Sequence, residues 1–188
     1  SEEALASLWN TLFKISRVLH DDYLEQWTRH NACLHQRALT LTNLGIEELL
    51  FRGPGTDLVV GLSTRARFRA GSDLGPYGAS FQPNIPTEEC FSTPDCRRTH
   101  GIVRTTRPFL VNGEMVRGLE LEFRGGEIVN ANATSGIETF REYISSDAGA
   151  RKLGEVALVG IDSAVYQSGL VFEEILLDEN AACHIAIG

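Results

Sequence analysis

The chain has 188 residues, of which 17 are Lys or Arg and 25 are Asp or Glu, and its formal net charge is −8. This length suits one domain with a sizeable core. The acidic balance and the lack of a basic run exclude a protein built to bind nucleic acid, since such proteins concentrate Lys and Arg, and no apolar run reaches the roughly 18 residues of a membrane-spanning helix.

Two helices are predicted in the first part of the chain. An apolar stripe with spacings of three and four indicates the first helix. Asp21 or Asp22 is suited to cap the second helix, because a short carboxylate satisfies free backbone N–H groups there, and Gly45 is expected to end it. We expect the two helices to form a hairpin or to pack together on a sheet. The stripe consists of Leu5, Leu8, Trp9, Leu12 and Phe13.

Gly and Pro become frequent after the second helix, and short apolar runs alternate with turn signals. Glu48 to Phe51 and Leu58 to Leu62 flank Gly53-Pro54-Gly55, which predicts two strands joined by a turn. Gly101 to Arg107 is a further candidate strand.

A second hairpin is predicted farther along the chain. Apolar residues alternate with Glu in Val116 to Phe123, and Gly125-Gly126 then turns the chain into Glu127 to Ala133. Gly136 to Ser146 carries a helical stripe, and Ser135 is a candidate cap for this helix.

The last part of the chain is predicted less fully. Leu153 to Val159 reads as a buried strand, whereas Leu170 to Gly188 is compatible with helix or strand. The expected fold is therefore α+β, with an N-terminal helical pair followed by a largely antiparallel sheet with helices, in a single domain over residues 1–188.

Two carboxylates lie in a short segment bracketed by Pro86 and Pro94. Because extended residues point alternately to opposite sides, Glu88 and Glu89 should face opposite ways, one to solvent and one inward. A buried carboxylate needs a partner, and a metal ion is one such partner. An exposed acidic turn is the alternative interpretation.

Glu155 and His184 are candidates of the same kind. Glu155 follows Gly154 at the start of an apolar strand, where a glycine lets a ligand approach, although a solvated strand end has the same pattern. Neutral imidazole is a common metal ligand, and Asp178 or Glu179 could orient the ring of His184. A buried histidine with satisfied hydrogen bonds is the alternative.

The other metal-binding residue types give weaker signals. His30 and His35 do not share a helix face, and His100 is expected on the surface. Cys183 would point away from His184 on a strand, so we expect it in the core. The spacing of the four cysteines matches neither a redox nor a zinc-finger motif, which favours reduced thiols and a cytoplasmic location.

Taken together and in order, these segments resemble the thermophilic-type metal-dependent aminopeptidases, the family of aminopeptidase T, aminopeptidase S and PepS. The resemblance covers nearly all of the chain. The segments that carry it are Gly53–Asp57, Asn84–Glu89, Phe91–Pro94, Arg151–Leu158 and Leu177–Gly188.

The resemblance implies an enzyme that removes N-terminal residues from peptides with two divalent metal ions (Zn, Co, Mn or Mg). By the match, Glu89, Glu155 and His184 are metal ligands, and Glu155, as a bridging carboxylate, is the candidate catalytic residue. The expected partners are peptides with a free N-terminus and a second copy of the chain, with no nucleic acid and no membrane.

The family pattern also contains parts that this sequence lacks. An α/β domain precedes the matching region, and a Tyr, a later His and an Asp follow the first histidine ligand. The chain is thus expected to be the core of the catalytic domain, without its C-terminal end. A non-catalytic module for dimerisation or peptide binding, with an incomplete metal site, is the alternative function, and a different hydrolase built on the same three ligands is a third.

Overall fold

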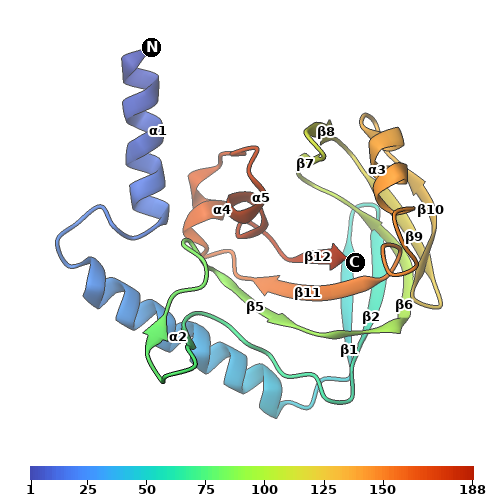
Figure 1. The fold of residues 1–188 in the computed structure, drawn as a ribbon, viewed down its shortest axis with the longest axis horizontal. Helices are drawn as coiled ribbons and strands as arrows, with labels where there is room; N and C mark the ends of the chain where they lie inside the picture. Colours follow the sequence, from blue (N-terminus) through green and yellow to red (C-terminus); the bar gives the residue numbers. More distant parts are fainter.

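The computed structural model describes residues 1–188 and confirms the predicted α+β class (Figure 1). Two N-terminal helices precede a set of antiparallel sheets with three short helices among them. None of the helices combines the length and the apolar character that a membrane crossing requires.

The helical pair consists of α1 (Glu2–Ile15) and α2 (Tyr23–Asn43). It is not a hairpin: α1 contacts α4, whereas α2 contacts β5, and α1 projects from the body of the molecule (Figure 1). The apolar stripe of α1 consequently stays largely exposed. Asp22 occupies the N-cap of α2, but its carboxylate accepts a hydrogen bond from the Gln26 side chain and not from the backbone. Gly45, with a φ of +61°, follows the helix end as predicted.

The larger sheet has five strands in the order β1-β2-β6-β9-β10, and every neighbouring pair is antiparallel. Both predicted hairpins are present, as β1–β2 and β9–β10. The strands are β1 (Glu48–Gly53), β2 (Thr56–Leu62), β6 (Pro94–Arg104), β9 (Glu120–Arg124) and β10 (Glu127–Asn132).

Strand β6 begins earlier than the predicted Gly101 to Arg107, because its first half is a polar, partly exposed strand without an apolar pattern. Gly101 itself has a φ of +110°, and a Cβ there would lie 2.1 Å from the carbonyl oxygen of Asp57 on β2. Only glycine permits this close approach of the two backbones.

The smaller sheet has the order β12-β11-β5 and is also antiparallel. It comprises β5 (Glu89–Ser92), the predicted buried strand β11 (Leu153–Val159), and β12 (His184–Ile187). The ambiguous last segment therefore contains both types of structure, since the short helix α5 (Ile175–Glu179) precedes β12.

Short elements complete the fold. Strand β3 (Asp73–Leu74) pairs with β4 (Ser80–Phe81), and β7 (Phe109–Val111) pairs with β8 (Glu114–Val116). Helices α3 (Ile137–Tyr143) and α4 (Ala164–Ser168) lie before and after β11.

The predicted cap of α3 is wrong. Gly136, with a φ of +73°, is the N-cap, and the Ser135 hydroxyl instead donates to the carbonyl of Met115. The close approach of Gly136 to β8 explains the difference, because a Cβ there would lie 2.9 Å from the same Met115 carbonyl oxygen.

One apolar core joins α2, α3 and both sheets, with Leu34, Val60, Phe123, Phe140 and Val156 among its buried members. A smaller cluster of Ile15, Val165 and Ala181 fixes the end of α1 against α4 and the segment after α5. The large core includes Val156 on β11 and thereby anchors the smaller sheet.

Candidate metal centre

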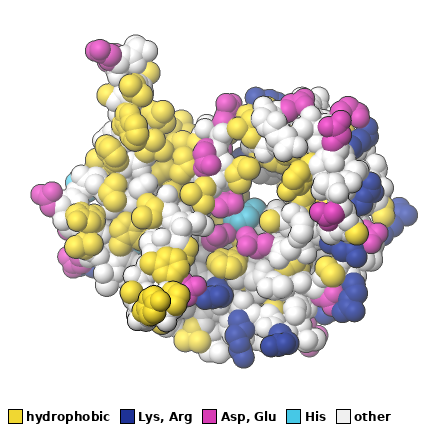
Figure 2. Space-filling view, in the orientation of Figure 1, with side chains coloured by type: hydrophobic (Ala, Val, Ile, Leu, Met, Phe, Trp, Pro, Cys, Tyr) yellow, Lys and Arg dark blue, Asp and Glu magenta, His cyan; other side chains and the backbone are white.

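The three predicted ligands, Glu89, Glu155 and His184, converge on the smaller sheet. One ligand atom from each lies within 4.8 Å of the others. Nε2 of His184 is 2.9 Å from Oε2 of Glu89 and 3.8 Å from Oε1 of Glu155. Histidine and acidic side chains are seen together beside the hollow at the centre of the face in Figure 2.

Strand register explains why these side chains meet. Glu89 on β5 lies opposite Val159 on β11, and His184 on β12 lies opposite Ala157, two residues away on the same strand. Residues that lie opposite each other in a sheet point to the same face, as do residues two apart. Glu155, two residues before Ala157, is therefore on this face as well.

The donor set fits a divalent cation. Oε2 of Glu89 and Nε2 of His184 are buried and have no hydrogen-bond partner, because their close contact lacks hydrogen-bond geometry. Unpaired buried polar atoms are costly. A cation held between them would satisfy both, and two carboxylates with one imidazole suit zinc, cobalt or manganese.

The imidazole of His184 is oriented for such a role. Its Nδ1–H donates to the carbonyl of Ala182 at 3.0 Å, which directs Nε2 toward the carboxylates. The expectation that Asp178 or Glu179 orients this ring is wrong, because the Ala182 carbonyl is the partner of Nδ1. The Asp178 carboxylate instead accepts the backbone N–H groups of Phe172 and Glu174, at 2.9 and 3.3 Å.

Several acidic groups lie close together at this centre, and burial and mutual repulsion shift their pKa values. Burial, and then the negative charge of Glu89, raise the pKa of Glu155. The pKa of Glu179 is raised to about 7, mainly by burial. The charge of His184 opposes this increase, and the charges of Glu89 and Glu155 add to it. Burial lowers the pKa of His184, but the Glu89 carboxylate and the Ala182 carbonyl outweigh this and raise it. A bound cation would relieve the repulsion among these carboxylates.

Two further expectations about neighbouring residues need correction. The side chains of Glu88 and Glu89 point to opposite sides of the backbone, as predicted. Both are buried, however, and neither faces solvent. Cys183 is exposed and not part of the core, because it precedes the edge strand β12; its Sγ accepts the backbone N–H of Val159.

The remaining histidines stay outside the centre, as predicted. Nε2 of His30 lies 2.7 Å from the carbonyl of Thr87, Nε2 of His35 lies 2.9 Å from that of Ser72, and His100 is exposed on β6.

A family of thermophilic metalloproteases (M29) matches residues 1–188. The chain belongs to this family. It is 42% identical to aminopeptidase T of Thermus aquaticus and 40% identical to aminopeptidase PepS of Streptococcus thermophilus, in both cases over 187 residues. These matches cover 100% of this chain and 46% and 45% of the two relatives, so the chain spans about half of their length.

Solved structures agree with this membership in the M29 family. Wild-type AmpT from Thermus thermophilus superimposes with a TM-score of 0.92 at 41% identity, over 100% of this chain and 46% of that chain. A 2,5-dihydroxypyridine dioxygenase from Pseudomonas putida KT2440 shares the fold alone, with a TM-score of 0.55 and 15% identity over 92% of this chain and 49% of that chain.

Proposed function

We propose that this M29 chain provides the metal-binding core of an aminopeptidase that removes N-terminal residues from peptides. The observation that carries the proposal is the convergence of Glu89, Glu155 and His184 on one face of the smaller sheet. Divalent ions bound there, two by analogy with the family, would supply Lewis acidity that polarises a scissile carbonyl and makes water more acidic.

The three residues have different roles in this proposal. Glu89 supplies a buried negative charge, and His184 would supply Nε2, which must lose its proton to bind a cation and whose direction is fixed by the Ala182 carbonyl. The Glu155 side chain is 37% exposed, which leaves it accessible to water and to substrate. By analogy with the family, Glu155 would help to hold the ions as a bridging carboxylate, and it is the candidate group that accepts a proton from water.

A substrate with a free N-terminus suits a centre that binds divalent ions. By analogy with the family, one bound ion would hold the free α-amino group of the peptide. An internal peptide bond offers no such group, so the site is better suited to an exopeptidase than to an endopeptidase.

We further propose that residues 1–188 form one domain of a cytoplasmic enzyme that acts as a homodimer. The exposed apolar side chains of α1, Leu5, Leu8, Trp9 and Phe13, support a protein contact at this helix. Size measurement by light scattering tests the dimer, and a monomer for both the wild type and Trp9→Ser would reject it.

The alternative is a non-catalytic dimerisation or peptide-binding module. It is favoured by the small number of ligands, since three side chains leave two ions under-coordinated.

Metal content and hydrolysis of an amino-acid anilide, measured after dialysis against Zn²⁺, Co²⁺ and Mn²⁺ in turn, separate the two functions. We expect bound metal and hydrolysis in the wild type and neither in Glu89→Gln. Glu120→Gln, which changes an exposed glutamate on β9, is the matched control. Metal binding without hydrolysis would favour the alternative, and no metal binding would reject the proposed centre.

A further inference from the structure

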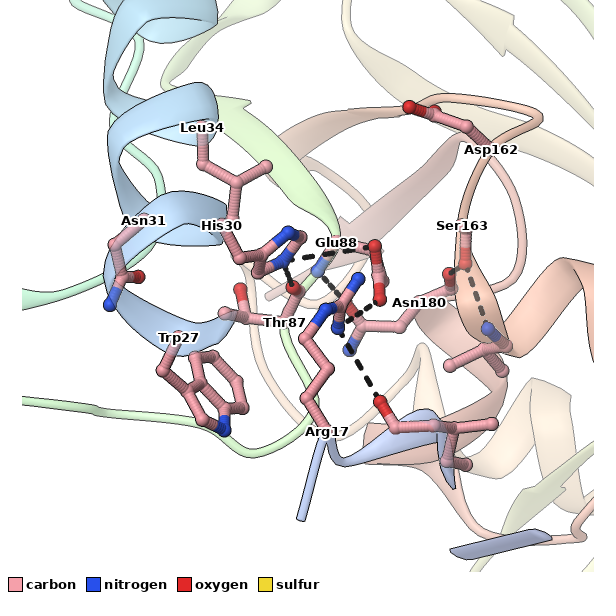
Figure 3. Close-up of polar contacts among 12 residues, drawn as sticks. Arg17, Trp27, His30, Asn31, Leu34, Thr87, Glu88, Asp162, Ser163 and Asn180 are labelled. Atoms are coloured by element: carbon pink, nitrogen blue, oxygen red, sulfur yellow. Dashed lines mark hydrogen bonds and ion pairs between the residues drawn. The ribbon is translucent and has the colours of Figure 1, made fainter. Parts of the chain in front are cut away.

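Buried side chains hold the residues that precede the proposed ligand Glu89 (Figure 3). The backbone N–H of Glu88 donates to Oδ1 of Asn180 at 2.7 Å. The carbonyl of Thr87 lies 2.7 Å from Nε2 of His30 on α2. The backbone that leads into Glu89 is thus fixed by two distant parts of the chain.

Asn180 is itself held rigidly. Its side chain is fully buried, at 0% exposure. Its Nδ2 donates to the backbone carbonyl of Leu176 at 2.8 Å, and its backbone carbonyl accepts the Ser163 hydroxyl at 2.6 Å. With the Glu88 N–H bound to Oδ1, both polar atoms of the side-chain amide are used, and the direction of Oδ1 is determined.

The position of Asn180 links two ligands. It lies four residues before His184, at the end of α5, and its side chain binds the residue next to Glu89. One side chain therefore joins the chain segment that carries the imidazole to the segment that carries the buried carboxylate. These two ligands lie on strands that pair with β11 and not with each other.

The carboxylate of Glu88 provides a second attachment on the opposite side. It is 5% exposed, and its Oε1 lies 2.6 Å from Nη1 of Arg17, in the link between α1 and α2. The guanidinium lies 5.8 Å from the centre of the Trp27 ring. A buried ion pair is a weak source of stability, because desolvation offsets the attraction. The pair is better explained by a role in holding the residues before Glu89 in one arrangement.

We propose that Asn180 is a positioning residue of the metal centre. Its hydrogen bond to the Glu88 N–H sets the separation of Glu89 and His184. The Arg17–Glu88 pair prevents the backbone before Glu89 from moving away from Asn180. The inference rests on the proposed metal centre and adds the residue that orients its ligands.

Loss of groups that orient metal ligands typically weakens metal affinity about 10–100-fold. A residue with only a structural role would lower the melting temperature and leave the affinity of the folded chain unchanged. Metal affinity is thus the measurement that distinguishes the two roles.

The experiment is titration of the chain with Co²⁺, followed by calorimetry and by the visible absorption of the bound ion. The variants are Asn180→Ala and Asn180→Leu; the second keeps the side-chain volume and decides the question if the first does not fold. Asn31→Ala is the matched control, because the Asn31 side chain also joins separate segments, through hydrogen bonds with Ser72 and Gln82 that involve no neighbour of a proposed ligand.

We expect both Asn180 variants to bind Co²⁺ at least about 10-fold more weakly, with altered absorption, and Asn31→Ala to bind as the wild type does. Wild-type affinity in a folded Asn180 variant would overturn the positioning role and leave the metal centre in place. Failure of the wild-type chain itself to bind Co²⁺ would reject the centre, and with it this inference.

Discussion

His184 and Glu89 lie on the two outer strands of the smaller sheet, and Nε2 of His184 is 2.9 Å from Oε2 of Glu89 across the strand between them. Ala157 pairs with His184 on one side and with Phe91, two residues after Glu89, on the other. Its side chain is fully buried. Because Ala157 is on the same face of the sheet as both ligands, we infer that its small methyl group leaves room for Nε2 and Oε2 to approach.

This relationship predicts the effect of a larger residue at position 157. Ala157→Leu should separate the two ligand atoms and abolish Co²⁺ binding, with an overpacking cost of about 1–3 kcal/mol. Ala150→Leu, at another buried alanine, should cost a similar amount of stability and leave Co²⁺ binding intact. Calorimetric titration and chemical denaturation of both variants provide the comparison, and equal Co²⁺ binding by the two would contradict the interpretation.

The titrating groups of the metal centre should make the stability of the metal-free chain fall as pH rises, whereas His30, whose pKa is lowered by burial, opposes this decline below pH 6.5. Burial raises the pKa of Glu179 from 4.5 to about 7, and contact with Glu89 raises that of His184 above 6.5 despite burial. Between their unfolded and folded pKa values the native state binds more protons than the unfolded state, so stability is lost with increasing pH. We expect the decline to begin above the unfolded pKa of Glu179 and to continue through pH 7.

Thermal melts in the absence and presence of Zn²⁺ measure this effect. The ion binds deprotonated ligands, so its stabilisation should grow with pH and oppose the decline. Glu179→Gln should make the metal-free decline smaller, because it removes one of the three groups of the centre whose pKa values are raised. If the melting temperature of the metal-free chain rises steadily from pH 5 to about 8, the predicted direction of the pH dependence is wrong.

The buried ion pair predicts a large effect of a single substitution. Arg17→Met leaves the Glu88 carboxylate buried without its closest cation, which should cost about 3–5 kcal/mol of unfolding free energy. The double variant Arg17→Met/Glu88→Gln removes both charges and should recover part of the loss. Urea denaturation measures all three unfolding free energies, and no recovery in the double variant would assign the cost to lost packing of the arginine.

Backbone geometry predicts a difference between two glycines. Gly101→Ala should lose about 1–3 kcal/mol from its positive φ, and the clash with the Asp57 carbonyl should add to this loss. Gly113, with a φ of +83°, has no atom within 4 Å of an added Cβ, so Gly113→Ala should show only the conformational cost. Similar unfolding free energies for the two variants would show that the β2–β6 contact adjusts without strain.

The sequence alone determined the elements whose signals are local. The alternation of Leu119, Leu121 and Phe123 predicted a strand with one buried face, and all three side chains are buried. Glycines at turns predicted both hairpins, because positive φ is a property of single residues. The resemblance to metal-dependent aminopeptidases was also carried by short, contiguous motifs, and membership in the M29 family confirmed it.

Tertiary structure alone decided how these elements combine. Strand alternation placed Glu88 and Glu89 on opposite sides, but only the register with β11 directs Glu89 toward His184 and Glu88 toward Arg17. Asn180 gave no signal of its role, because its partner lies 92 residues away. Local periodicity reports which face of an element is apolar, whereas contacts between distant residues depend on packing of the whole chain.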